Sequence, residues 1–312
     1  MKRRSFITNT VLAAPLVACA SPSLLSSAVI KETSTNTNAI EPFKLKFGPH
    51  LGMFKNLAGK DPIDQLNFMA DQGFSAYEDN GMSGRDIALQ EKMASTMGNR
   101  GLEMGVFVAH KIYWKEPNLA SGKEDKRVEF LADITKAVEV ARRVNAKWMT
   151  VVPGHLDLRQ DMGYQTANVI ETLKQASAIC EPHNITMVLE PLNKRNHPGL
   201  FLTEAGQAFQ ICQAVGSPSC KILFDIYHQQ IQEGNLIPNI DASWDEIAYF
   251  QIGDNPGRNE PTTGEINYKN VFQHIHDKGS THVLGMEHGN SVDGAEGEKK
   301  LIAAYRSVDL AG

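Results

Sequence analysis

Short runs of apolar and β-branched residues alternate with longer amphipathic stretches from residue 44 onward. The short runs predict strands and the amphipathic stretches predict helices. Residues 124–145 give the clearest helical spacing, because apolar side chains recur there every three or four positions. The predicted strands are 45–51, 75–79, 103–109, 148–153, 186–191, 222–227, 249–253 and 283–287, and the clearest helices are 62–72, 84–99, 124–145, 164–183, 204–215, 267–277 and 296–308.

Eight strands that alternate with helices pair in parallel, and units of roughly 33 residues fit a single-domain (β/α)8 TIM barrel at residues 44–312. A doubly wound open sheet is the alternative. Its dinucleotide-binding version has no support, since no GxGxxG sequence follows the first strand. The sixth connection lacks a clear helical pattern, and residues 241–247 are its best candidate for a helix.

The first 19 residues have a different pattern. A basic start precedes the apolar stretch 6–18, which is too short to cross about 30 Å of hydrocarbon as a helix. This arrangement predicts an export signal, and residues 3–7 (RRSFI) resemble the twin-arginine type. A general secretory signal is the alternative. Either signal predicts an exported, periplasmic protein.

Residues 16–19 (LVAC) also resemble a bacterial lipobox, in which Cys19 becomes a lipidated N-terminus. The sequence leaves this lipid anchor open, because small residues precede the cleavage point of export signals in general. With the lipid, the protein would be a membrane-anchored lipoprotein. Residues 20–43 are rich in Ser, Thr and Asn without hydrophobic periodicity, and predict a flexible linker.

The composition excludes several classes of protein. A hydrophobic content of 42% and a charged content of 21% exclude a disordered or collagen-like chain. The net charge is −5, and −8 without the three basic residues of the leader, which argues against a nucleic-acid partner. Cys180, Cys212 and Cys220 are odd in number and lack CxxC spacing, so they predict buried small side chains rather than a disulfide framework.

Polar side chains stand at the ends of the last four predicted strands. They are Glu190, Asp225, Gln251 and Glu287, separated by 35, 26 and 36 residues. The carboxyl ends of barrel strands meet at one rim, where the chemistry of such barrels takes place. We therefore expect these four side chains to converge.

Three carboxylates in one apolar setting repel one another and are costly to bury unless they are paired or bound to a cation. Salt bridges to nearby Lys or Arg are the alternative for each acid alone. Four oxygen-bearing residues at barrel spacing favour one divalent metal ion. Oxygen ligands suit Mg²⁺ or Mn²⁺, and carboxylates also hold Zn²⁺ or Co²⁺.

The segments around these residues resemble the hydroxypyruvate isomerase group of xylose-isomerase-like barrels, which also includes ketose 3-epimerases. The resemblance covers residues 44–290. It is carried by residues 190–199 (EPLNKRNHPG), 225–230 (DIYHQQ), 233–236 (EGNL), 251–258 (QIGDNPGR) and 264–268 (GEINY).

The resemblance implies an isomerase with a small sugar or keto-acid substrate. It makes Glu190, Asp225, Gln251 and Glu287 the ligands of one divalent ion (Mg, Mn, Co or Zn) and makes the two glutamates the catalytic acid/base pair. The implied reaction is proton transfer through an enediolate, with the choice of base left open. It also implies that His228 donates a hydrogen bond to a substrate oxygen.

Arg258 and His110 are further candidates for substrate contact. Arg258, in the loop after strand 7, could hold a substrate oxygen or carboxylate, and an ion pair with Glu260 or Glu265 is its alternative. His110 follows strand 3 and is either a pocket residue or a structural histidine. His288 should point away from the barrel interior if its strand is regular.

Three other functions remain open. A ketose or 3-keto-sugar epimerase could use the same site, although Gln251 matches the isomerases and the epimerases usually have His there. A non-catalytic sugar-binding barrel would not need Glu190 and Glu287. An endonuclease-IV-like barrel would need more histidines and a basic face. Export puts the substrate in question, since hydroxypyruvate is a cytoplasmic metabolite, and the sequence leaves a homo-oligomer open.

Overall fold

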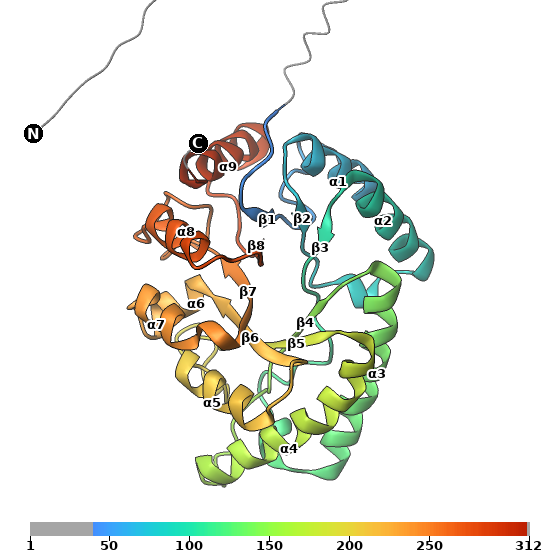
Figure 1. Cartoon of the computed structure of the whole chain (residues 1–312), viewed down its shortest axis with the longest axis vertical. Coiled ribbons are helices and arrows are strands. Elements are labelled where there is room, and N and C mark those ends of the chain that lie inside the picture. Colours follow the sequence, from blue (N-terminus) through green and yellow to red (C-terminus); the bar gives the residue numbers. More distant parts are fainter. Residues whose placement is uncertain (1–39, 311–312) are drawn as a thin grey trace, which may run out of the picture. The chain divides into compact units, whose positions relative to one another are not determined.

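The structure is a computed structural model and describes residues 40–310. Eight strands surround the centre of the barrel and the helices lie outside them (Figure 1). The strands are β1 (Lys46–Gly48), β2 (Ala76–Tyr77), β3 (Glu103–Met104), β4 (Trp148–Val151), β5 (Thr186–Leu189), β6 (Cys220–Asp225), β7 (Ile247–Ile252) and β8 (Val283–Met286). The helices are α1 (Pro62–Asp71), α2 (Ile87–Arg100), α3 (Glu124–Val144), α4 (Met162–Cys180), α5 (Ala205–Val215), α6 (Ile226–Gln232), α7 (Leu236–Ser243), α8 (Tyr268–Asp277) and α9 (Gly294–Val308).

The ring of strands is closed by two short bridges. Six strands form one parallel sheet in the order β1-β8-β7-β6-β5-β4, and β2 pairs with β3. At one junction the Glu78 N–H donates to Pro49 O at 3.0 Å, and at the other the Thr150 N–H donates to Phe107 O at 2.8 Å. The expected TIM barrel is therefore confirmed, and the open-sheet alternative is wrong.

Alternation along the strands separates two apolar layers, because successive side chains point to opposite faces. The large outer cluster joins strand residues to the helices. The buried residues of the inner cluster all lie in strands or at strand ends, and their side chains fill the interior of the barrel. Its members are Ala76, Val106, Val188, Leu223, Tyr249 and Val283.

The connection after β6 differs from the prediction. The helix predicted at residues 241–247 is confirmed only in part: α7 begins earlier and ends at Ser243, a 3-10 turn follows at Trp244–Glu246, and Ile247 already belongs to β7. Helix α6 starts directly at the strand end, since the Asp225 carboxylate accepts hydrogen bonds from two of its backbone N–H groups. Gly234 and Asn235 then separate α6 from α7 with φ values of 63° and 47°, which these residue types tolerate.

Packing of the barrel begins before residue 44. Phe43 is buried, its ring centroid lies 4.6 Å from that of Phe74, and its N–H donates to Gly73 O at 3.0 Å. The predicted linker at residues 20–43 therefore extends at least one residue too far, because Phe43 belongs to the barrel. The predicted export signal at residues 1–19, including Cys19, lies outside the described residues.

Two further observations concern the described part of the chain. Cys180, Cys212 and Cys220 are buried and free, as the sequence predicts. No helix within residues 40–310 has the length and apolarity needed to cross a membrane.

The packing of Phe43 can be tested by removing its ring. We expect F43A to lower the free energy of unfolding by about 3 kcal/mol, because a buried phenylalanine leaves a cavity when it is truncated. Urea unfolding measures this loss. I40A is the matched control, since Ile40 is 47% exposed, and it should cost less than about 0.5 kcal/mol. Equal, small losses in both variants would contradict the placement of Phe43 in the core.

Candidate active site

Five polar side chains project into the carboxyl end of the barrel, and we call them the barrel-mouth group. Four of them lie two positions after a member of the inner cluster and the fifth, Glu287, lies four positions after Val283, so the alternation that fills the barrel also aims these side chains inward. Four of them are at most 7% exposed, and the side chain of Glu287 is 26% exposed. The group consists of Glu78, Glu190, Asp225, Gln251 and Glu287.

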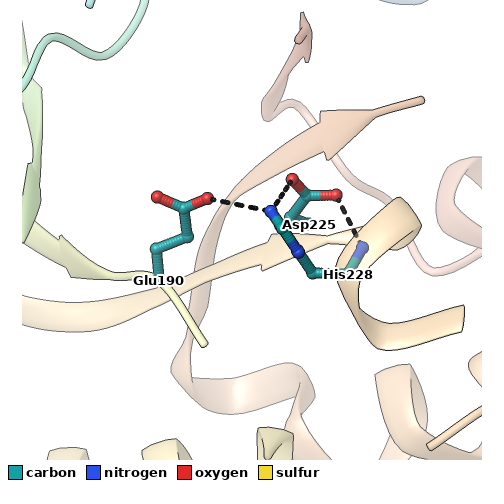
Figure 2. Close-up of side chains that lie close together, drawn as sticks. All are labelled: Glu190, Asp225 and His228. Carbon is teal, nitrogen blue, oxygen red and sulfur yellow. Dashed lines mark hydrogen bonds and ion pairs between the residues drawn. The ribbon is translucent and has the colours of Figure 1, made fainter. Parts of the chain in front are cut away.

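Glu190, Asp225 and His228 form a compact cluster within this region (Figure 2). His228 Nε2 lies 4.0 Å from Glu190 Oε1 and 3.6 Å from Asp225 Oδ2. Asp225 also accepts a hydrogen bond from the His228 backbone N–H at 3.1 Å. One aspartate therefore ends β6, caps α6 and holds His228 beside the two carboxylates.

The hydrogen bonds of Asn193 fix the tautomer of His228. The Asn193 backbone N–H points at His228 Nδ1 at 3.4 Å, and Asn193 Nδ2 lies 2.6 Å from the same nitrogen. The amide orientation is set independently, because Asn193 Oδ1 accepts from the Asn196 backbone N–H at 2.8 Å. His228 Nδ1 is thus the acceptor, and Nε2 carries the proton. Burial lowers the pKa of His228 to about 4, so the ring is neutral and presents Nε2–H to the carboxylates.

Arg258 brings a positive charge to the barrel-mouth group. Its Nη2 donates to Asp225 Oδ2 at 3.0 Å and to Glu287 Oε2 at 2.8 Å. Its Nε donates to Glu287 O at 3.1 Å. The ion pair that the sequence suggested with Glu260 or Glu265 is not formed. Glu260 instead accepts from Ser291, while Glu265 lies within hydrogen-bond distance of Asn255.

Glu287 is the most accessible carboxylate of the group. Its Oε1 accepts from Asn80 Nδ2 at 2.9 Å, and its other oxygen is held by Arg258. It lines a cavity of about 330 Å³ together with Glu78, Asn80 and His50. A cavity of this size is in the range of small-molecule sites.

Sequence reasoning missed Glu78, which directly follows β2. Its Oε1 accepts from Gln251 Nε2 and its Oε2 from the Tyr249 hydroxyl, both at 2.9 Å. The signal was present, because Glu78 stands two positions after the inward-facing Ala76, as Glu190 stands after Val188.

Burial raises the pKa values of the glutamates in the barrel mouth. The pKa of Glu190 lies well above its usual value because of burial first, and then because of Glu287 and Asp225. Burial and Glu287 act in the same way on Glu78. For Glu287, burial raises the pKa and Arg258 opposes the rise. Four carboxylates thus share the site with one contacting guanidinium, which favours a further cation.

The donors in the barrel mouth fit a divalent cation. Gln251 Oε1 is buried and has no hydrogen-bond partner among the described residues. Carboxylate and amide oxygens are the ligands that Mg²⁺ and Mn²⁺ prefer. The structure therefore gathers the four predicted ligands, while the metal itself stays a prediction. His228 is a donor in this tautomer, so its Nε2 has no lone pair to offer.

Two histidines near the strand ends face away from the barrel mouth. His110 accepts the Val152 N–H at Nε2, 3.2 Å away, and its Nδ1 contacts Lys111 O at 2.9 Å. Both ring nitrogens are occupied by backbone, so we assign His110 a structural role instead of the predicted substrate contact. His288 Nε2 lies 2.7 Å from the Tyr305 hydroxyl of α9, on the helix side of the strand as expected.

A sequence model of the xylose isomerase-like TIM barrel family matches residues 66–308. The chain belongs to this family. Among curated relatives, hydroxypyruvate isomerase of Escherichia coli is 33% identical over 167 residues, which span 54% of this chain and 64% of that protein. The 2-oxo-tetronate isomerase of Cupriavidus necator is 30% identical over 230 residues, 72% of this chain and 86% of that protein. These relatives confirm the expected class of enzyme, an isomerase.

Solved structures of similar fold support the barrel. AP endonuclease, family 2 from Brucella melitensis superposes with a TM-score of 0.72 at 25% identity, covering 81% of this chain and 96% of that one. The 3-keto-D-glucoside 4-epimerase YcjR of E. coli superposes with a TM-score of 0.70 at 17% identity, covering 85% of this chain and all of that one, and shows the fold alone.

The structural role of His110 predicts a pH dependence of stability. Burial lowers its pKa to about 4 from 6.5 in the unfolded chain, so its neutral form contributes fully above pH 6.5 and the contribution is lost as pH falls toward 4. H110Q keeps an acceptor for Val152. Between pH 7 and pH 5 we expect the free energy of unfolding of H110Q, measured in urea, to fall by about 2 kcal/mol less than that of the parent protein.

A matched control separates this effect from general acid sensitivity. H276Q replaces an exposed histidine on α8. Its free energy of unfolding should fall between pH 7 and pH 5 by the same amount as that of the parent protein. An unchanged loss in H110Q would show that His110 does not titrate on unfolding.

Proposed function

We propose that this chain is a metal-dependent isomerase of a small keto acid or sugar, similar in reaction to hydroxypyruvate isomerase. One observation carries the proposal: the buried Glu190 after β5 and the partly exposed Glu287 after β8 face the same barrel mouth, with Asp225 and Gln251 between them. The names of the relatives favour a keto acid or a closely related sugar acid as substrate.

Glu190, Asp225, Gln251 and Glu287 would hold the divalent ion. Such an ion supplies Lewis-acid chemistry, polarising the carbonyl and hydroxyl oxygens of the substrate and stabilising negative charge that develops when a proton leaves carbon. The unpartnered Oε1 of Gln251 supports this ligand set.

The two glutamates carry the protons. One takes the proton from the carbon that bears the hydroxyl, and the pair returns a proton to the former carbonyl carbon. The hydroxyl proton moves to the former carbonyl oxygen, which completes the isomerisation without net gain or loss of atoms.

His228 and Arg258 would bind and orient the substrate. The fixed tautomer of His228 presents Nε2–H as a donor for a substrate oxygen. Arg258 reaches the same mouth with a guanidinium that suits a carboxylate or carbonyl oxygen. Protein contacts hold both groups in place before the substrate binds, so binding costs little of their conformational entropy.

Substitution of either glutamate tests the acid/base pair. We expect E190Q and E287Q each to abolish measurable turnover, a loss of about 10²-fold to 10⁴-fold or more, because the amide takes up no proton. The assay follows hydroxypyruvate, tartronate semialdehyde and common ketoses with Mg²⁺, Mn²⁺, Co²⁺ or Zn²⁺. Chelation of the ion should also remove activity, and the added ion should restore it.

The control is E260Q, since Glu260 is buried but lies outside the barrel-mouth group. It should stay active if the loss is chemical. Exchange of substrate C–H for deuterium in D₂O separates the alternatives: an epimerase exchanges and returns the epimer, while a sugar-binding barrel shows no exchange. Activity retained in E190Q or E287Q would refute the acid/base assignment.

We also propose that the protein is exported, on the strength of residues 1–19 alone. Substitution of both arginines, R3K with R4K, should keep the protein in the cytoplasm if the twin-arginine pathway carries it. C19S should move it from the membrane fraction to the soluble periplasmic fraction if Cys19 is lipidated. Cell fractionation measures both, and a cytoplasmic location of the parent protein would contradict export.

A further inference from the structure

We propose that Glu78 is a positioning residue that turns the amide of Gln251 so that its carbonyl oxygen faces the metal position. The inference rests on the proposed function, because it takes Gln251 as a metal ligand. It adds a residue that directly follows β2 and acts on the metal site through Gln251.

The contacts between β2 and β7 define the arrangement. Tyr249 and Gln251 both point inward from β7, two positions apart, and Glu78 lies between them and accepts a hydrogen bond from each at 2.9 Å. All three side chains are at most 1% exposed. Water therefore does not compete for these hydrogen bonds, and each is worth more than it would be at the surface.

The chemistry of the acceptor determines the orientation of the amide. The ionised form of Glu78 accepts hydrogen bonds and does not donate them, and the hydrogen bonds from Gln251 and Tyr249 favour this form by lowering the pKa against the effect of burial. Ionised Glu78 Oε1 therefore selects the NH₂ end of the Gln251 amide. A flipped amide would place two oxygens against each other in a buried setting, which costs at least the lost hydrogen bond. In the observed orientation Gln251 Oε1 is left without a partner, as a metal ligand would be.

Two glycines make room for this arrangement. A Cβ atom at Gly285 in β8 would lie 1.7 Å from Glu78 Oε2, and one at Gly105 after β3 would lie 2.3 Å from the Tyr249 hydroxyl oxygen. Glycine weakens a strand interior and often marks a close approach of another group. At these two positions the strands give up packing to admit Glu78 and Tyr249.

Metal affinity provides a test that does not depend on activity. Mn²⁺ is titrated calorimetrically into the metal-stripped parent protein and into E78A, Q251A and the double variant. We expect E78A to weaken Mn²⁺ binding about 10-fold to 100-fold, the usual effect of removing a group that orients a ligand. In the Q251A background the same substitution should cost nothing further, because no amide remains to be oriented.

Two variants separate orientation from folding. E298A removes another buried glutamate with hydrogen bonds to Asn56 and Leu57, remote in sequence from β2 and β7, and should leave Mn²⁺ affinity unchanged even if it lowers stability. E78Q keeps an oxygen that can accept from Gln251, so it should restore much of the affinity lost in E78A and serves if E78A fails to fold.

The outcomes distinguish this inference from the proposed function. If the parent protein binds Mn²⁺ and D225N abolishes binding, but E78A has no effect or has equal effects with and without Gln251, then Glu78 does not orient a ligand and the inference alone is overturned. If the parent protein binds no divalent ion, the metal-based function and this inference both fail. A loss in E78A that disappears in the Q251A background supports both.

Discussion

Repulsion among carboxylates is the constraint around which the barrel mouth is organised. Glu190, Asp225 and Glu287 are drawn together with Glu78 at the carboxyl ends of four strands, where burial makes each charge costly. Arg258 contacts two of them and offsets part of the cost. The raised pKa values follow first from burial and then from this concentration of charge. The same concentration of negative charge supports the cation site that we propose.

Two functional side chains of this site, His228 and Asp225, are oriented by backbone N–H groups, which can only donate hydrogen bonds. Backbone N–H groups of Asn193 and Asn196 set the tautomer of His228, and the first turn of α6 fixes Asp225. Backbone donors do not titrate or flip, so the orientations of His228 and Asp225 persist across conditions. Such preorganisation is what allows electrostatic stabilisation without rearrangement during a reaction.

Because side chains alternate along a strand, some titratable residues face the barrel mouth and others face the surrounding structure. Glu287 faces the mouth, while its neighbour His288 faces α9 and contacts Tyr305. His110 likewise satisfies backbone groups and stays neutral because burial lowers its pKa to about 4. Lowering the pH would therefore reduce stability by protonating these histidines, and would separately change catalysis by protonating the glutamates.

The sequence by itself determined the eight strands and the inward direction of Glu190, Asp225, Gln251 and Glu287, because periodicity and strand parity are local properties of the chain. It did not determine the partners of Arg258, the backbone contacts of His110 or the start of α6 at Asp225. The role of Glu78 appeared only in the closed barrel, where its side chain reaches Tyr249 and Gln251 of β7 across the interior. Hydrogen bonds across a barrel join residues far apart in the chain, so only the tertiary structure decides them.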